Sequence, residues 1–302
     1  MYDLIKRHYL REEVREEIAD YARDRWVGLH CQARDEKGRM LLVRYTEGRR
    51  PLTIREKGDV LKALQKYSRL RPRTFYASSN LYWKMEREGD VASLANVKAC
   101  TPCWDIDNTF DSWRSTITAC QEIVSALDKM GVAKSVSVYW SGEGAHVRIH
   151  HEAFSPELRS KIHPLDLAFA VVEFIARKVE PKIIEEQVKS EGKLKVENKM
   201  DPQRLFTCPL SLHRELDVVC VCIPLNKLSS FDPEWVRPDV YRHSRDWRRF
   251  EVGEADELAQ RAYEAVGGYP RAVGGRCRRR KYRRVDEAIK SSLSKLLRED
   301  HF

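Results

Sequence analysis

The segment Cys103-Trp104-Asp105-Ile106-Asp107 most constrains the fold of this 302-residue chain. Side chains alternate between the two faces of a β-strand, so Asp105 and Asp107 would lie on one face and Trp104 and Ile106 on the other. Two neighbouring carboxylates repel each other unless a cation lies between them, and oxygen ligands suit Mg²⁺ or Mn²⁺. Because a solvated strand end has the same pattern, the motifs that follow have to decide between the two interpretations.

A second motif joins a glycine turn to a hydroxyl and an imidazole. Two alternating segments predict a pair of strands, and the turn between them contains Ser141, Gly142, Gly144 and His146. Two glycines leave backbone N–H groups open to phosphate oxygens. A plain hairpin with a buried histidine would have the same pattern, so this motif alone does not predict a binding site.

A third motif supplies an acid, a fixed cation, a hydroxyl and a second imidazole. Asp201 comes three residues before Arg204, and Ser211 and His213 follow in a Pro-x-Ser-Leu-His segment. Arginine is always charged and presents a fork of donors to phosphate oxygens, and histidine donates in either protonation state. These side chains suit the binding of a polyphosphate.

The three motifs, in this order, resemble those of the archaeal and eukaryotic primase superfamily. The sequence is most similar to the small catalytic subunit of archaeal replicative primase, whose relatives include the polymerase domains of bacterial end-joining ligases. Residues 74–82 resemble the Tyr-x-Ser-Ser-x-x-x-Tyr strand that precedes the Asp-x-Asp strand in small subunits. Residues 223–233 resemble the closing segment of those subunits. The resemblance covers about residues 10–240.

The resemblance implies a DNA-directed nucleotidyltransferase that synthesises or extends primers on single-stranded DNA with two Mg²⁺ or Mn²⁺ ions. Asp105, Asp107 and a third acid would hold the metal. The third acid is either Asp201, which we favour because it is an aspartate, or Glu197, which requires a shorter loop. The family's lysine between Arg-Leu and Pro is absent, and Thr207 stands near its place. The residues implied to bind the incoming NTP or dNTP are Ser141, Gly142, Gly144, His146, Arg204, Ser211 and His213.

Two alternatives to a replicative primase subunit remain open. A stand-alone gap-filling or end-joining repair polymerase of the same superfamily would use the same chemistry without a primase large subunit as partner. A catalytically silent relative would keep the fold and bind nucleic acid, but would lack the third acid and the triphosphate lysine.

The resemblance also implies a mixed α+β fold, with an RRM-like antiparallel sheet flanked by helices and an N-terminal α/β unit. The N-terminal unit would span about residues 1–100 and the RRM-like unit about 100–250, so that 1–250 form the catalytic domain and 251–302 a helical basic tail. Apolar periodicity predicts helices over 12–25, 57–68, 112–129, 165–179 with an extension to 190, and 254–266, and strands over 25–29, 40–45, 103–107, 135–140, 147–150 and 216–224. The resemblance implies a further strand over 74–82.

Composition and charge are compatible with this interpretation. With 42% hydrophobic residues the chain can form a core, yet no apolar run reaches the length of a membrane helix. The N-terminus lacks an apolar signal-peptide core, so we expect an intracellular location and no membrane partner. A net charge of +9 favours a polyanionic partner.

Two basic features are candidate nucleic-acid contacts. Arg25 begins a predicted strand and either faces nucleotide or template, or is an ordinary surface arginine. A run of cations near the C-terminus is either a solvated tail or a contact for the phosphate backbone. Its candidate residues are Arg278, Arg279, Arg280 and Lys281.

The eight cysteines are expected to be reduced thiols. Cys100 and Cys103 have the spacing of a zinc knuckle, but no second such pair lies near them in the sequence. We therefore do not expect structural zinc.

Overall fold

The computed structural model describes residues 2–271. The chain divides into two units, Met1–Tyr269 and Pro270–Phe302. The boundary therefore follows Tyr269 rather than residue 250, because helix α8, Asp256–Val266, packs against helix α7, Pro164–Lys189, within the first unit. The predicted basic contacts Arg278, Arg279, Arg280 and Lys281 lie outside the described residues.

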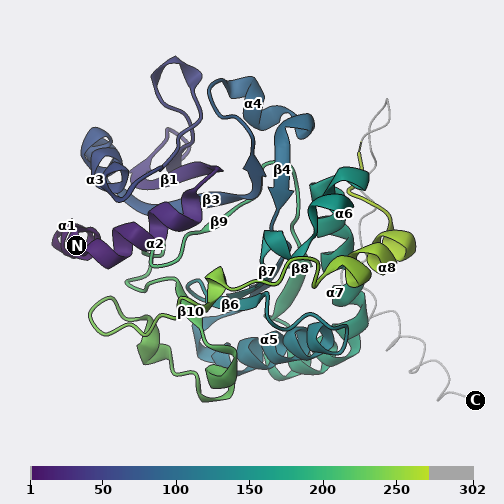
Figure 1. Cartoon of the computed structure of the whole chain (residues 1–302). Coiled ribbons are helices and arrows are strands. Elements are labelled where there is room, and N and C mark those ends of the chain that lie inside the picture. Colours follow the sequence, from purple (N-terminus) through teal and green to yellow (C-terminus); the bar gives the residue numbers. More distant parts are fainter. Residues whose placement is uncertain (1, 272–302) are drawn as a thin grey trace, which may run out of the picture. The chain divides into compact units, whose positions relative to one another are not determined.

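The first sheet of this unit has five antiparallel strands in the order β2-β1-β3-β4, with β9 also paired to β3 (Figure 1). Because β1 pairs along one edge of β3, strands β4 and β9 share the other edge. Helix α2 packs on β1 and β3, and helices α1 and α3 pack on α2. The bounds are β1 Arg25–Arg34, β2 Met40–Val43, β3 Pro72–Tyr82, β4 Val97–Cys100, β9 Leu205–Thr207, α1 Tyr2–Leu10, α2 Glu12–Ala22, α3 Lys57–Lys66 and α4 Glu88–Ala92.

The second sheet has the strand order β10-β6-β7-β5-β8 and is also antiparallel. Four of its strands and two crossover helices form a β-α-β-β-α-β unit, and the sheet order β8-β5-β7-β6 matches the RRM-like arrangement that we predicted. The bounds are β5 Cys103–Asp107, α5 Trp113–Asp128, β6 Val136–Trp140, β7 Ala145–Ile149, α6 Pro156–Lys161, β8 Lys195–Asn198 and β10 Val221–Ile223.

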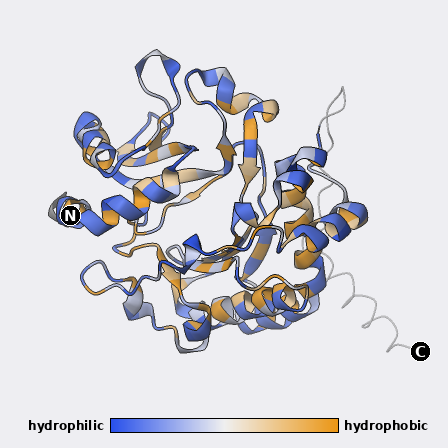
Figure 2. Ribbon diagram, in the orientation of Figure 1, coloured by the Kyte–Doolittle hydropathy of each residue, from blue (hydrophilic) through white to orange (hydrophobic). Residues whose placement is uncertain are grey.

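One face of the second sheet is apolar and packs on helices α5 and α7. Trp104 and Ile106 of β5 point to this face and are almost fully buried, and Trp104 Nε1 donates to the Val172 carbonyl of α7 at 3.0 Å. Hydrophobic and hydrophilic residues alternate along α5 (Figure 2). Because side chains alternate along β5, Asp105 and Asp107 point to the face opposite that of Trp104 and Ile106.

The two sheets share one hydrophobic core. Phe75 of the first sheet and Val147 of the second belong to the same buried cluster. The chain passes between the sheets three times, at residues 101–102 between β4 and β5, at 199–204 between β8 and β9, and at 208–220 between β9 and β10. These crossings bring distant segments of the sequence to the polar face of the second sheet.

Most predicted elements are confirmed. The predicted helix over 165–179 and its extension to 190 form the single helix α7, which continues through Pro181 because the buried Val179 and Ile183 on either side hold it against the core. The polar strand β8, the short strands β4 and β9 and the helices α1 and α4 were not predicted. Among residues 2–271, no helix combines the length and the apolar composition needed to cross a bilayer.

Candidate active site

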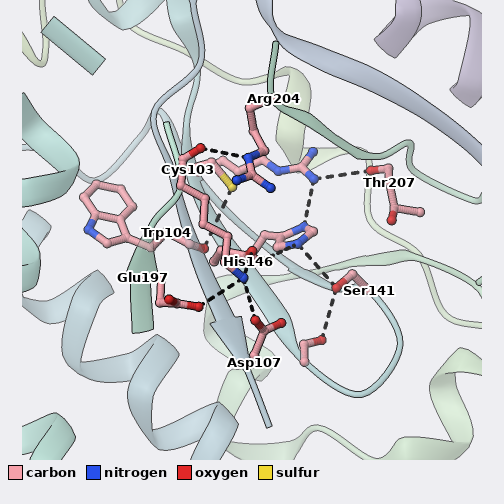
Figure 3. Close-up of polar contacts among 12 residues, drawn as sticks. Cys103, Trp104, Asp107, Ser141, His146, Glu197, Arg204 and Thr207 are labelled. Carbon is pink, nitrogen blue, oxygen red and sulfur yellow. Dashed lines mark hydrogen bonds and ion pairs between the residues drawn. The ribbon is translucent and has the colours of Figure 1, made fainter. Parts of the chain in front are cut away.

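Three carboxylates surround one ammonium on the polar face of the second sheet. Strand β8 pairs with β5 so that Glu197 lies opposite Asp105. Lys199 Nζ lies 2.7 Å from Asp105 Oδ2, 2.6 Å from Asp107 Oδ2 and 3.2 Å from Glu197 Oε2. In Figure 3, the dashed lines from Asp107 and Glu197 meet at a single nitrogen, which is this ammonium. The fold thus gathers three acids around one cation position.

The electrostatics of the site favour the charged forms of Asp105 and Lys199. Burial by itself would raise the pKa of Asp105, but the hydrogen bond from His146 and the charge of Lys199 outweigh it and hold that pKa well below its usual range. Burial would lower the pKa of Lys199, but its carboxylate partners raise it above its usual value. At neutral pH Asp105 is therefore ionised and Lys199 carries its positive charge.

Carboxylate oxygens are suitable ligands for Mg²⁺ or Mn²⁺. In this structure, however, the side chains lie farther apart than the ligands of a bound metal ion. Within the described residues 2–271, no three Asp, Glu, His or Cys side chains lie close enough together to hold a metal ion. The three carboxylates lie 2.6 to 3.2 Å from Lys199 Nζ, whereas oxygens bind Mg²⁺ at about 2.1 Å. Asp105, Asp107 and Glu197 could therefore hold a divalent cation if Lys199 left and their oxygens moved inward.

His146 orients Asp105. Strand β7 pairs with β5 so that the two residues lie opposite each other. Arg148 Nη2 donates to His146 Nδ1 at 2.9 Å, and because a guanidinium only donates, the ring proton lies on Nε2. His146 Nε2 is 3.1 Å from Asp105 Oδ1. Burial, aided by Arg148, lowers the pKa of His146, so the imidazole is neutral and donates to the acid.

Sequence reasoning missed Arg148. Its side chain is buried, and Nη1 donates to the Tyr21 hydroxyl at 2.6 Å while the guanidinium lies over the Tyr139 ring. Arg148 comes two residues after His146, so alternation along β7 was the signal that could have located it on the same face. By donating to Nδ1, Arg148 selects the tautomer of His146 that can donate to Asp105.

The glycine turn brings the second and third motifs together. A Cβ atom at Gly142 would lie 2.6 Å from the His213 ring, and one at Gly144 would lie 2.1 Å from the Ile106 carbonyl oxygen. The turn therefore packs directly on the end of β5 on one side and on His213 on the other. Both glycines are required by this close approach, and Gly142 also has a φ of +145°.

The imidazole of His213 is neutral. Its Nδ1 accepts from the Leu216 N–H at 3.0 Å, which leaves the ring proton on Nε2, the side that faces Gly142. Burial, with a smaller effect of the Arg214 charge, lowers the pKa of His213 to about 4. The ring can therefore donate a hydrogen bond beside the turn at neutral pH.

The chain is similar in structure to proteins of known structure, although its sequence matches no family model and no curated protein sequence. The structure is similar to the polymerase domain of Mycobacterium tuberculosis ligase D in complex with DNA, with a TM-score of 0.51 and 12% identity over 89% of this chain and 90% of that one. The two share a fold. This confirms the predicted mixed α+β class.

A second solved structure is more distant. The AEP domain of the cyanophage S-2L primase-polymerase has a TM-score of 0.34 and 15% identity, over 74% of this chain and 89% of that chain. That score is too low to define a shared fold.

The acid that lies beside the aspartate pair is Glu197, whereas Asp201, which we favoured as the third metal ligand, makes other contacts. Asp201 Oδ1 accepts from the Gln203 N–H at 2.7 Å, and Oδ2 lies 3.5 Å from Arg204 Nη2. Pairing with β5 ends at residue 198, so the chain has left the carboxylates before it reaches Asp201. Arg204 also donates from Nε to the Lys199 carbonyl at 2.8 Å, which holds this loop beside the site.

Two other predicted site residues lie inside the fold. Ser211 is fully buried, and its Oγ accepts from the Phe75 N–H at 2.8 Å, which leaves no exposed atom for a nucleotide. Arg25 is buried rather than at the surface, and it donates to the Ser78 carbonyl at 2.7 Å and to Thr101 Oγ1 at 2.8 Å. We therefore assign neither side chain to a ligand.

The paired cysteines Cys100 and Cys103 are buried thiols at the junction of β4 and β5. Burial raises the pKa of each to about 12, so both are protonated at neutral pH. Their packing supports the junction between the two sheets.

Proposed function

We propose that this chain is a DNA-directed nucleotidyltransferase of the primase-polymerase type, which synthesises or extends primers on single-stranded DNA. One observation carries the proposal: Asp105, Asp107 and Glu197 converge on a single cation position. The fold shared with a ligase D polymerase domain supports the same conclusion. NTPs or dNTPs would be the substrates.

Each group of residues has a separate task in this proposal. When bound, two divalent ions would bring the attacking 3′-hydroxyl to the α-phosphate and neutralise charge on the leaving pyrophosphate. Asp105, Asp107 and Glu197 would hold the metal, and His146, which lies 3.1 Å from Asp105 Oδ1, would keep Asp105 oriented toward it. The triphosphate lies against the turn and the loop, where its partners are Ser141, the N–H groups of Gly142 and Gly144, Arg204 and His213.

The proposal is tested by removing both aspartates. The purified chain is incubated with single-stranded template, labelled ATP or dATP, and Mg²⁺ or Mn²⁺. We expect product from the native chain and none from Asp105→Ala plus Asp107→Ala, because removal of a single group that stabilises transition-state charge already costs about 10²- to 10³-fold. Asp128→Asn is the control, because this exposed acid ends α5 on the opposite face of the sheet. Unchanged extension by the double variant would disprove the mechanism.

Lys199 favours a second candidate, a catalytically silent nucleic-acid-binding protein. Its ammonium already pairs with all three carboxylates, so the site is an ion-pair cluster without metal. Calorimetry with Mn²⁺ and a nucleoside triphosphate separates the candidates. Nucleotide-dependent metal binding argues for the enzyme, and absence of binding argues for the silent protein.

The two possible biological roles, replicative primase and repair polymerase, differ in the DNA on which the enzyme acts. A replicative subunit would copurify with a primase large subunit, whereas a stand-alone repair polymerase would act alone on gapped or broken DNA. The purified chain should therefore be compared on unprimed single strands and on gapped duplexes. Starts on unprimed DNA favour a primase, and extension confined to gaps favours a repair polymerase.

A further inference from the structure

Lys199 occupies the position that a divalent cation would need. It follows β8 directly, and its side chain reaches back so that Nζ lies within 3.2 Å of all three carboxylates. The side chain is only 24% exposed, and the carboxylate of Asp105 is 13% exposed, so water screens this ion pair poorly. The ammonium is thus a bound counter-ion that the chain itself supplies.

A metal ion and this ammonium exclude each other. Oxygens bind Mg²⁺ at about 2.1 Å, and the same oxygens already lie 2.6 and 2.7 Å from Lys199 Nζ in the two shortest pairs. Both cations would have to occupy nearly the same point, and two positive charges at that distance repel strongly. Metal binding must therefore break three ion pairs before it gains its own contacts.

We infer that Lys199 is a built-in competitor of the divalent cation, and that it makes metal binding depend on the nucleoside triphosphate. The inference rests on the proposed function, because it requires that the three carboxylates bind metal. An ammonium displaced from its carboxylates is left without a counter-charge, and a bound triphosphate supplies one within reach of its flexible four-carbon stem. Metal alone gains no such compensation, so metal and triphosphate bind cooperatively.

The substitution Lys199→Met tests the effect of the charge separately from that of side-chain packing, because it removes the charge and keeps much of the side-chain volume. We expect Mn²⁺ alone to bind about tenfold more tightly to the variant, and the coupling between Mn²⁺ and triphosphate to fall by a similar factor, within the usual range of coupling energies. The metal-free variant should unfold at a lower temperature, since three carboxylates lose their counter-ion, and Mn²⁺ should raise its melting temperature more than that of the native chain.

The experiment is isothermal titration of the full chain with MnCl₂, without and with a non-hydrolysable nucleoside triphosphate. Lys199→Arg keeps the charge and should bind Mn²⁺ no more tightly than the native chain. Lys195→Met is the matched control: this exposed lysine of β8 lies opposite Asp107, and the structure of residues 2–271 gives it no ion pair with an acid. It removes the same charge from the same strand without removing a direct competitor.

The outcomes are distinguishable. Tighter Mn²⁺ binding by Lys199→Met but not by Lys195→Met supports the inference. Equal or weaker Mn²⁺ binding by Lys199→Met overturns it, and so does an equal gain by Lys195→Met, which would indicate a general charge effect. If neither the native chain nor Lys199→Met binds Mn²⁺, with or without triphosphate, the proposed function fails together with the inference.

Discussion

At the scale of single residues, the question is whether Glu197 or Asp201 is the third acid beside Asp105 and Asp107. Asp201 and Glu197 lie four residues apart, yet Glu197 faces Asp105 across a strand pair while Asp201 contacts Arg204. The side-chain type favoured Asp201, because it is an aspartate and because Glu197 required a shorter loop. The pairing register favours the glutamate, because opposite residues of an antiparallel pair share one face of the sheet.

The isosteric variants Glu197→Gln and Asp201→Asn test this assignment. We expect Glu197→Gln to lower metal-dependent extension by at least about 100-fold, comparable with the loss of a group that stabilises transition-state charge. Asp201→Asn should cost less than about tenfold, since it weakens one exposed contact with Arg204. Extension rates and Mn²⁺ affinities measure both effects. A larger loss in Asp201→Asn would restore Asp201 as the metal-facing acid.

The turn between β6 and β7 is the element that links the motifs. Its residues 141–144 lie between the end of β5 and His213, and the Gly144 carbonyl accepts from the Ser141 N–H at 2.9 Å. Trp140 Nε1 donates to the Gly142 carbonyl at 2.5 Å and anchors the turn to the apolar core. The turn is therefore a rigid wall of the site.

We predict that Gly144→Ala disturbs this element. The added Cβ would lie 2.1 Å from the Ile106 carbonyl oxygen, so either the turn or the end of β5 has to shift. We expect a loss of about 1–3 kcal/mol in the free energy of unfolding and weaker triphosphate binding. Gly89→Ala is the control, because nothing lies within 4 Å of its added Cβ and the site is helical. Equal stability of the two variants in urea denaturation would contradict this packing.

At the scale of the whole first unit, a buried acid ties the N-terminal helix α2 to the segment after β10. Glu17 of α2 is 1% exposed, and its Oε1 lies 2.7 Å from Arg248 Nη1. Its Oε2 accepts from Trp247 Nε1 at 2.8 Å and lies 3.1 Å from His243 Nε2. These contacts join residues more than two hundred positions apart, roughly the length of the unit.

The pKa of Glu17 predicts a pH-dependent contribution to stability. Burial would raise this pKa, but hydrogen bonds from His243, Arg248 and Trp247 outweigh it and lower the pKa to about 2 from 4.5. Because the folded value is the lower one, the stabilisation is present above pH 4.5 and is lost as the pH falls toward 2. Glu17→Gln should cost about 2–3 kcal/mol at pH 7.

Urea denaturation of the native chain and Glu17→Gln at pH 7, 4 and 3, compared pairwise, measures this contribution. The difference in free energy of unfolding should shrink as the pH falls. A difference that stays constant over this range would show that the charge of Glu17 does not stabilise the fold.

Local patterns predicted the elements that carry strong periodicity. The alternation in β5 and β6 and the apolar stripe of α5 were sufficient, because these segments bury one face against the core. Strand β8 was missed because its side chains are exposed or half-buried and lack an apolar face.

The sequence by itself determined which side chains share a strand face, such as Asp105 with Asp107, because alternation along a strand depends only on neighbouring residues. The tertiary structure alone decided that Glu197 faces Asp105 and that Lys199 lies among the three acids. Strand β8 pairs with β5 only after the elements that separate them in the sequence have packed. These elements include α5, β6, β7 and α7. That packing is a property of the whole unit, and no short segment encodes it.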